Sequence, residues 1–178
     1  MKFALDATSL VVLPWSSFGI FLALVLIFLK KGARLANVFL GAFLLSYSLG
    51  NLGSVPTHSG FITSVPHIFG VFMPFIFLIG PFLFLYILAL TRPGFRFTMP
   101  DILHFVPYAT VLFLLIVFVY VQSADVKLDL IRRIQNGQMP WGFTVYAIGR
   151  IAHVLIYLAL CLNLLRKHTK ALPDHFST

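Results

Sequence analysis

Residues 78–108 read LIGPFLFLYILALTRPGFRFTMPDILHFVPY, and this stretch decides how the chain folds. An apolar run ends at Thr91, a short turn with two arginines and two prolines follows, and a second apolar run begins at Ile102. Pro93 and the glycine after it break the first helix, because proline removes a backbone donor. The second helix restarts near Asp101, since an acidic side chain is favourable at a helix N-terminus. The pattern predicts two membrane-spanning helices joined by a basic turn.

The composition extends this prediction to the whole chain. Of the 178 residues, 60% are hydrophobic and 10% are charged, and the mean hydropathy is +0.97. A soluble domain is about 45–50% apolar and about 25% charged. The longest polar stretch, residues 122–140, is too short to form a core of its own. We therefore expect the lipid bilayer, rather than water, to surround most of the chain.

The polar breaks divide the chain into five apolar segments. Each is long enough to cross a hydrocarbon core of about 30 Å as a helix, and helix is required because lipid offers the backbone no hydrogen-bond partner. The sequence therefore predicts an all-α, polytopic transmembrane bundle that forms a single domain over residues 1–178. The predicted spans are about 10–29, 36–53, 66–90, 102–121 and 141–165.

The distribution of Lys and Arg predicts the orientation of this bundle. The side of the membrane that carries more of these cations faces the cytoplasm, so the N-terminus is expected outside and the C-terminus inside. Because the cations sit mainly at span ends, the net charge of +8 is explained by lipid headgroups, and no direct nucleic-acid contact is expected. The richer side has Lys30, Lys31, Arg34, Arg92, Arg96, Arg166, Lys167 and Lys170, and the other has Lys2, Lys127, Arg132 and Arg133.

Three local patterns bear on packing. Small residues recur every four positions in the second span and predict close helix packing within the bundle, with homodimerisation as the alternative; they are Ala42, Ser46, Gly50 and Ser54. Pro74 and the pair Gly80-Pro81 predict kinks in the third span, which act as a hinge or only shape the bundle. The outer segment 123–137 alternates charged and aliphatic residues and predicts either a surface amphipathic helix or a solvated loop.

The last span carries ionisable groups at helical spacing. Tyr146, Arg150, His153 and Tyr157 follow one another at intervals of four, three and four, which places them on one helix face. An arginine near the membrane centre costs about 2.5–3.5 kcal/mol, and no aspartate lies within a predicted span. Arg150 must therefore snorkel to the outer interface, bond tyrosines and carbonyls, meet an anionic ligand, or pair with an acid of another chain. Such an unpaired cation makes an incomplete bundle plausible.

No pattern of catalytic residues is present. The sequence lacks metalloprotease, CxxC, Walker A and GxSxG motifs, and no two acids share a predicted pocket, so no enzymatic activity is expected. Two membrane histidines can ligate haem, but His104 and His153 are predicted at different depths, and we expect no metal or cofactor. The single cysteine, Cys161, lies in an apolar run and is expected to pack as a small hydrophobe.

The opening stretch resembles the membrane region of a group of bacterial transcription regulators. These proteins join N-terminal transmembrane helices to a C-terminal helix-turn-helix domain of the arabinose-regulator (AraC) type. The end of this chain, IYLALCLNLLRKHTKALPDHFST, also resembles the fifth span and following basic segment of that family, including Phe176-Ser177. The other resembling features are Gly80-Pro81, Tyr86, the helix end at Leu90-Thr91 with Pro93, and the run Leu103-His104-Phe105-Val106-Pro107.

The resemblance implies a sensory membrane region in the bacterial cytoplasmic membrane. Members of the family continue with further spans and a DNA-binding domain, whereas this sequence stops at Thr178. It is then either a truncated piece or a separate membrane protein without its output domain, and its partners are further transmembrane helices or a second copy. The rival interpretations are a small transporter or channel subunit, with Arg150 and His153 lining a pathway, and a structural membrane partner protein.

Overall fold

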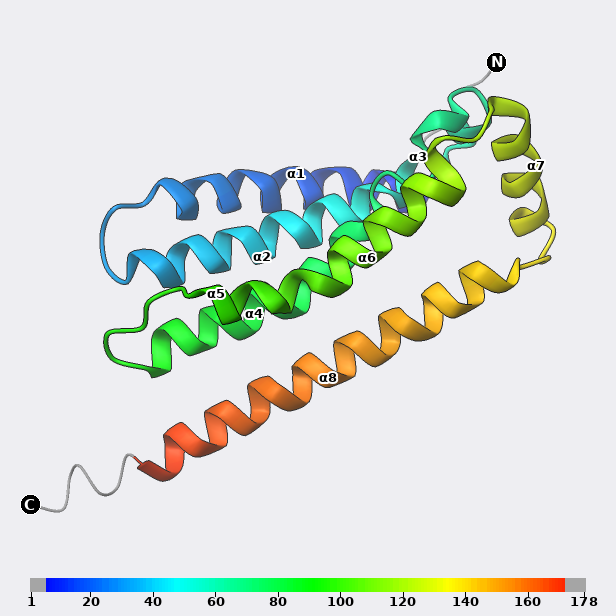
Figure 1. Ribbon diagram of the computed structural model, residues 1–178. Helices are drawn as coiled ribbons and strands as arrows, with labels where there is room; N and C mark the ends of the chain where they lie inside the picture. Colours follow the sequence, from blue (N-terminus) through cyan, green and yellow to red (C-terminus); the bar gives the residue numbers. More distant parts are fainter. Residues whose placement is uncertain (1–5, 172–178) are drawn as a thin grey trace, which may run out of the picture.

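The computed structural model describes residues 6–171 and contains only helical elements and turns in that range. The long helices run side by side in an elongated bundle (Figure 1). Within the described range, five helical segments are long and apolar enough to cross a membrane, which confirms the predicted all-α, five-span bundle. They are Ala7–Phe28, Arg34–His58, Pro66–Thr91, Met99–Tyr120 and Trp141–Lys170.

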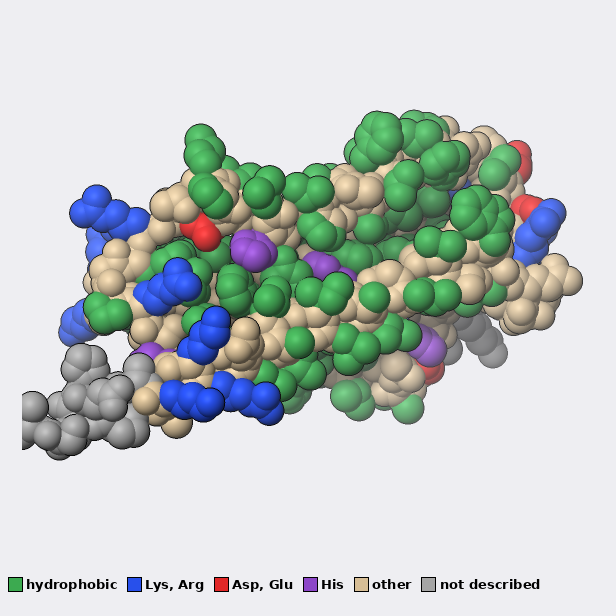
Figure 2. All heavy atoms as spheres, turned by 60° about the horizontal axis from the view of Figure 1, so that its bottom comes forward, with side chains coloured by type: hydrophobic (Ala, Val, Ile, Leu, Met, Phe, Trp, Pro, Cys, Tyr) green, Lys and Arg blue, Asp and Glu red, His purple; other side chains and the backbone are tan. Residues whose placement is uncertain are grey.

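The two ends of the bundle alternate as five spans require. The turn after α1 (Ala7–Phe28), the turn before α5 (Met99–Ile102) and the C-terminal end of α8 (Trp141–Ala171) lie at one end (Figure 1). The cations predicted for the richer side belong to these segments, and Figure 2 shows many Lys and Arg side chains gathered there. Lys2 lies outside the described residues. The membrane orientation itself stays a prediction.

Large apolar side chains cover the outside of the bundle, as a lipid environment requires. Figure 2 shows apolar side chains over most of the length of one face. Trp15 in α1, Phe113 in α6 (Val106–Leu115) and Ile148 in α8 each expose more than 60% of their surface. A water-soluble monomer rarely exposes such extended apolar patches. The exposure therefore agrees with the predicted partner, the bilayer.

Small residues allow α1 and α2 (Arg34–Leu52) to approach closely. A Cβ atom built on Gly19 would overlap the Ser48 hydroxyl, and one on Gly41 would lie 2.7 Å from the Ile27 side chain. The predicted stripe in α2 also faces the bundle at Gly50, where a Cβ would lie 3.2 Å from Ile76. The sequence analysis thus identified one small-residue face and missed the one that packs on α1.

The third span is confirmed over Pro66–Thr91, but its first part is not a regular helix. Two short 3₁₀ turns come before the α-helix α4, which begins only at Ile76 and runs to Thr91. The helix α3 (Ser54–His58) and a further 3₁₀ turn precede the span. Within the span, Gly70 adopts a left-handed conformation with φ of +81°, Pro66 is the first residue of one turn, and Pro74 is the second residue of the other. Pro74 therefore lies in a turn rather than kinking a regular helix. The turns are η1 (Phe61–Thr63), η2 (Pro66–Ile68) and η3 (Met73–Phe75).

The fourth span begins where the sequence predicted. The Asp101 carboxylate accepts hydrogen bonds from the Thr98 backbone N–H at 2.7 Å and from its hydroxyl at 2.8 Å, which satisfies a donor that the helix leaves free. The span then continues through short elements of different pitch rather than one regular helix. These are α5, η4 (Leu103–Phe105), α6 and the π-helical turn η5 (Ile116–Tyr120).

The outer segment forms the helix α7 (Ala124–Gln135), so the solvated-loop alternative is wrong. Figure 1 shows α7 lying across the end of the bundle opposite the C-terminus. Its buried residues are Lys127 and Ile131, four positions apart and therefore on one face. The last span, α8, is a single helix of 31 residues that packs on α4. The polar residues predicted to share a face all lie on this helix.

Candidate functional site

The polar face of α8 meets α4 along most of its length. The Tyr146 and His153 rings lie 5.7 and 5.0 Å from the Phe77 ring, centroid to centroid. One turn further on, the Tyr157 ring packs on Gly80 of α4. His153 and Tyr157 each expose only 7% of their surface. The spacing in the sequence thus predicted the face, and the structure supplies the helix that it contacts.

Gly80 is a point of close approach between α4 and α8. A Cβ atom at this position would lie 2.5 Å from Cγ of Tyr157 and 2.8 Å from its Cβ, which is shorter than any ordinary contact between carbon atoms. Only glycine therefore allows the tyrosine ring to lie against the α4 backbone. Pro81 follows inside the helix and is buried. The packing against Tyr157 accounts for a glycine at position 80 without any motion. The predicted hinge at Gly80-Pro81 therefore stays a prediction.

Tyr157 also joins α8 to the start of the fourth span. Its hydroxyl lies 2.9 Å from Nδ1 of His104 and donates to the His104 backbone oxygen at 3.2 Å. Because the Tyr157 hydroxyl donates its proton to that carbonyl oxygen, it can only accept from Nδ1, and His104 is then the tautomer with a proton on Nδ1. Phe84 of α4 closes the cluster, with its ring 5.0 Å from the His104 ring. We call Gly80, Phe84, His104 and Tyr157 the inner junction.

His153 is a buried polar group with one ring nitrogen, Nε2, left without a hydrogen bond within residues 6–171. It lies between the Phe77 ring and the Tyr157 ring, whose centroid is 4.7 Å from its own. The imidazole also has a hydrogen-bonding interaction with the backbone of Phe77. Nε2 is buried, and within the described chain it makes no hydrogen bond. Buried groups of this kind are uncommon and carry a free-energy cost.

Arg150 differs from its three neighbours on this face. Its side chain is exposed, and within residues 6–171 it forms no ion pair or hydrogen bond. It borders two hollows of the molecule. The first, of about 190 Å³, lies between α2, α3, the turns η1–η3 and α8, and we call it the outer cavity. The second, of about 310 Å³, lies between α2 and α8 over α4, and we call it the lateral groove.

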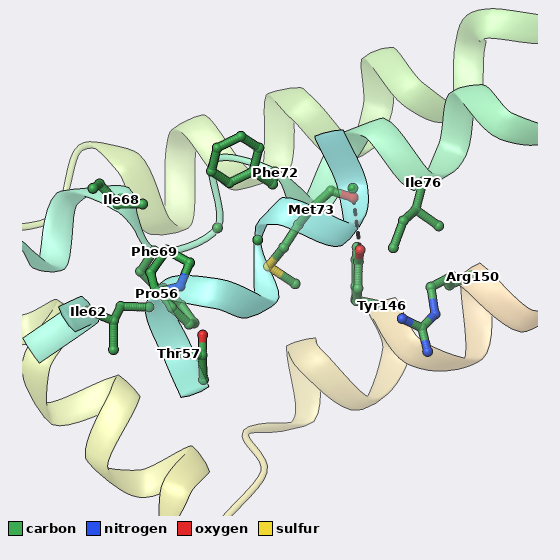
Figure 3. Close-up of a pocket in the computed structure, with 13 residues that line it drawn as sticks. Pro56, Thr57, Ile62, Ile68, Phe69, Phe72, Met73, Ile76, Tyr146 and Arg150 are labelled. Carbon is green, nitrogen blue, oxygen red and sulfur yellow. Dashed lines mark hydrogen bonds between the residues drawn. The ribbon is translucent and has the colours of Figure 1, made fainter. Parts of the chain in front are cut away.

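Figure 3 shows the outer cavity, with Arg150 beside Tyr146 on α8 and Ile76 across from them. The Tyr146 hydroxyl donates to the Met73 backbone oxygen at 2.9 Å (Figure 3). This bond satisfies a carbonyl in the irregular segment before α4, where the helical pattern is incomplete. Irregular backbone at membrane depth is tolerated where protein or a water-filled cavity surrounds it. The outer cavity fits that condition, because the irregular turns form much of its wall.

The remaining residues that the sequence singled out lie apart from Arg150. Tyr86 packs against the apolar cluster of Phe39, Leu85 and Leu88, and its hydroxyl makes no hydrogen bond in the described range. Pro107 lies in the first turn of α6, where its missing N–H leaves no bond unmade. Phe176-Ser177 lies outside the described residues. Of the resembling positions, Gly80 and His104 therefore join the polar face, and Tyr86 and Pro107 do not.

The sequence did not reveal a second polar cluster, which surrounds Lys127. Lys127 of α7 exposes 2% of its surface, and its ammonium donates to the Tyr120 backbone oxygen at 2.8 Å and lies 2.9 Å from Nδ1 of His67. The sequence analysis counted Lys127 only as an outer cation. Its spacing of four from Ile131 was the available signal, since it places the lysine on the apolar face of that helix. The cluster holds α7 onto the end of the bundle.

No known protein identifies this site. The chain matches no protein-family model, no curated protein and no solved structure. Among residues 6–171, no three His, Cys or acidic side chains are placed to hold one metal ion. His104 and His153 both pack on the Tyr157 ring, at 5.8 and 4.7 Å between centroids. They are thus closer than their predicted depths suggested, with a tyrosine as their common neighbour.

Proposed function

We propose that these helices are the membrane-embedded sensory region of a bacterial transcription regulator. One observation carries the proposal, namely the inner junction. Gly80 and His104 were singled out by resemblance to such regulators, and Tyr157 by its helical spacing with Arg150. The three residues come from separate spans and meet at one contact. Two independent features of the sequence therefore concern the same place.

The junction lies where a signal would leave the membrane. It joins α4, the start of the fourth span and α8 near the basic end of the bundle, to which α8 carries the chain (Figure 1). A ligand acts on such a contact when it binds one arrangement of the helices better than another. In this proposal the second arrangement separates Tyr157 from His104. The position of the basic end of α8 then reports the signal to the cytoplasm.

The transporter alternative has less support. It requires a pathway lined by Arg150 and His153, but the outer cavity and the lateral groove both include Arg150 and neither includes His153. His153 instead packs between aromatic rings and is almost fully buried. No separate observation favours a purely structural partner protein.

A topology experiment tests the proposal. Green fluorescent protein and alkaline phosphatase are fused in turn to the end of the full chain in a bacterial host. We expect fluorescence without phosphatase activity, because the predicted orientation places the C-terminus in the cytoplasm. The opposite result would refute a regulator that acts on DNA, and it would leave a transporter possible.

A second experiment tests the inner junction. A reporter DNA-binding domain fused to the same end gives a transcriptional output, which is compared between the wild type and Tyr157→Phe. The matched control is Tyr86→Phe, which removes a hydroxyl that makes no hydrogen bond within the described residues. We expect Tyr157→Phe to shift the output and Tyr86→Phe to leave it unchanged. Equal output from all three chains would count against the junction as the signalling contact.

A further inference from the structure

We infer that Arg150 and the lateral groove form a binding site for a single-chain fatty-acid carboxylate. The carboxylate would lie at Arg150, and the acyl chain would lie between α2 and α8. The inference names a ligand class for the proposed sensory region, and in that respect it rests on the proposed function. The binding itself is measured without any transcriptional output, so each can fail separately.

The charge of the site calls for an anion. Arg150 keeps its charge at any physiological pH, and within residues 6–171 no carboxylate lies in contact with it. Asp101, Asp125 and Asp129 all lie at or beyond the ends of the spans. An intramembrane cation normally pairs with an opposite charge or faces water. The planar guanidinium binds a carboxylate through two parallel hydrogen bonds.

The surroundings of the guanidinium call for an apolar tail. Deeper than Arg150 along α8, the lateral groove is lined by Ile151, Val154 and Leu155, and Ile79 of α4 forms part of its floor. Tyr47 and Asn51 of α2 add the polar groups of the opposite wall, and the Asn51 amide already donates to the Tyr47 backbone oxygen at 2.8 Å. The groove therefore offers a mainly aliphatic surface that begins at a cation.

The geometry favours one acyl chain over a phospholipid. Arg150 is nine residues past the start of α8 at Trp141, which is about 13 Å along the helix at about 1.5 Å per residue. A phospholipid headgroup stays at the interface, well above that depth. The groove volume of about 310 Å³ also lies at the lower end of the about 300–1,000 Å³ typical of small-ligand sites. The outer cavity, which shares Gly50, Ile76 and Arg150 with the groove, gives the carboxylate a route from the outer end.

A photo-crosslinking experiment tests the site. The full chain is placed in phosphatidylcholine nanodiscs and labelled with a diazirine analogue of dodecanoate, and the labelled residues are mapped by mass spectrometry. We expect saturable labelling around Val154, Leu155 and Ile79, competed by dodecanoate and not by its methyl ester, which has no charge for Arg150. Arg150→Gln should weaken the apparent affinity by about ten-fold or more, because the charge-assisted pair is lost.

Two further variants keep the test decisive. Arg132→Gln removes an exposed arginine of α7, away from the groove, and should leave labelling unchanged. Val154→Trp fills the groove and keeps Arg150, so it should abolish labelling even if Arg150→Gln does not assemble. Protection of the buried Cys161 from a thiol-reactive fluorophore in nanodiscs establishes that each variant is folded.

Several results would overturn the inference. Equal labelling of the wild type and of folded Arg150→Gln would show that the Arg150 charge does not contribute to binding. Equal competition by dodecanoate and by its methyl ester would show that the carboxylate charge does not contribute either. Displacement by acetate would mean that a free anion suffices, and displacement by phosphatidylglycerol would assign the site to a phospholipid headgroup. If dodecanoate binds and the reporter output does not respond, the site stands and the sensory function fails.

Discussion

Replacing Gly80 by alanine tests whether the close approach of α4 and α8 holds the bundle together. The added Cβ would lie 2.5 Å from Cγ of Tyr157, and carbon atoms at rest lie about 3.5–4.0 Å apart. The two helices must therefore separate by roughly 1 Å at the contact, or the ring must leave its position. Overpacking of this kind costs about 1–3 kcal/mol.

The helix propensity of alanine offsets part of that cost. Alanine is favoured over glycine inside a helix by about 0.8–1 kcal/mol, so the expected net loss for Gly80→Ala is at most about 2 kcal/mol. For a domain of this size, about 1 kcal/mol corresponds to a shift of about 2–4 °C in Tm. We therefore expect the Tm to fall by up to about 8 °C. The matched control is Gly149→Ala on α8, where the described residues leave open space around a built Cβ, and there the Tm should rise slightly.

The assay uses a property of the chain. Its single cysteine, Cys161, is buried with 4% of its surface exposed, so a thiol-reactive fluorophore reports unfolding as the protein is heated in nanodiscs. A double-mutant cycle with Tyr157→Ala completes the test. Removing the ring should relieve most of the cost of Gly80→Ala, whereas a glycine needed only as a hinge would show no such relief. A Gly80→Ala protein as stable as Gly149→Ala would refute the close approach.

Three other changes have defined outcomes. Tyr157→Phe should lower the free energy of unfolding by about 1 kcal/mol in the same assay, because the hydroxyl no longer bonds His104. Lys127→Met should speed hydrogen exchange of the α7 amides by about ten-fold, since two hydrogen bonds that hold α7 are lost, while Arg132→Met should not. Hydrogen bonds from Ser9, the third residue of α1, hold the pKa of the Asp6 carboxyl below its usual value of 3.8. The cap that Asp6 forms on α1 is therefore intact above pH 3.8, and it weakens as the pH falls through the lowered pKa. The protection of the first α1 amides, measured as the exchange rate relative to an unstructured peptide at the same pH, should then fall with acid in the wild type and not in Asp6→Asn.

The sequence predicted those parts of the fold that lipid alone dictates. Five spans follow from apolar length, because a backbone in hydrocarbon must satisfy its own hydrogen bonds. The restart near Asp101 was predictable for a local reason, since its carboxylate bonds the residue three positions earlier. Hydropathy did not show that residues 66–75 form turns instead of an α-helix, because these residues continue the apolar run of the helix after them and the span is assigned as one segment. There the conformation is set by Gly70 and the flanking prolines.

The candidate site was predictable only along one helix. Helical spacing places Tyr146, Arg150, His153 and Tyr157 on one face, but the partners of these side chains depend on how α4 and α8 are aligned, and spacing within α8 carries no such information. The pairing of Tyr157 with Gly80 and His104 therefore became visible only in the structure. The burial of Lys127 was hidden for a similar reason, because a lysine at a span end is usually a surface cation.

The polar groups along this face of α8 differ in how they are paired, and the difference bears on the proposed function. The inner end is closed, because Tyr157 has hydrogen bonds to His104 and ring contacts to its neighbours. Arg150, nearer the other end of the face, borders two hollows and has no charged partner in the described chain. Seven residues separate them on one continuous helix, about 10 Å at about 1.5 Å per residue. In the proposed mechanism, a ligand at Arg150 affects the inner junction by moving α8 as a unit, together with His153, which packs on the Phe77 and Tyr157 rings between the two sites.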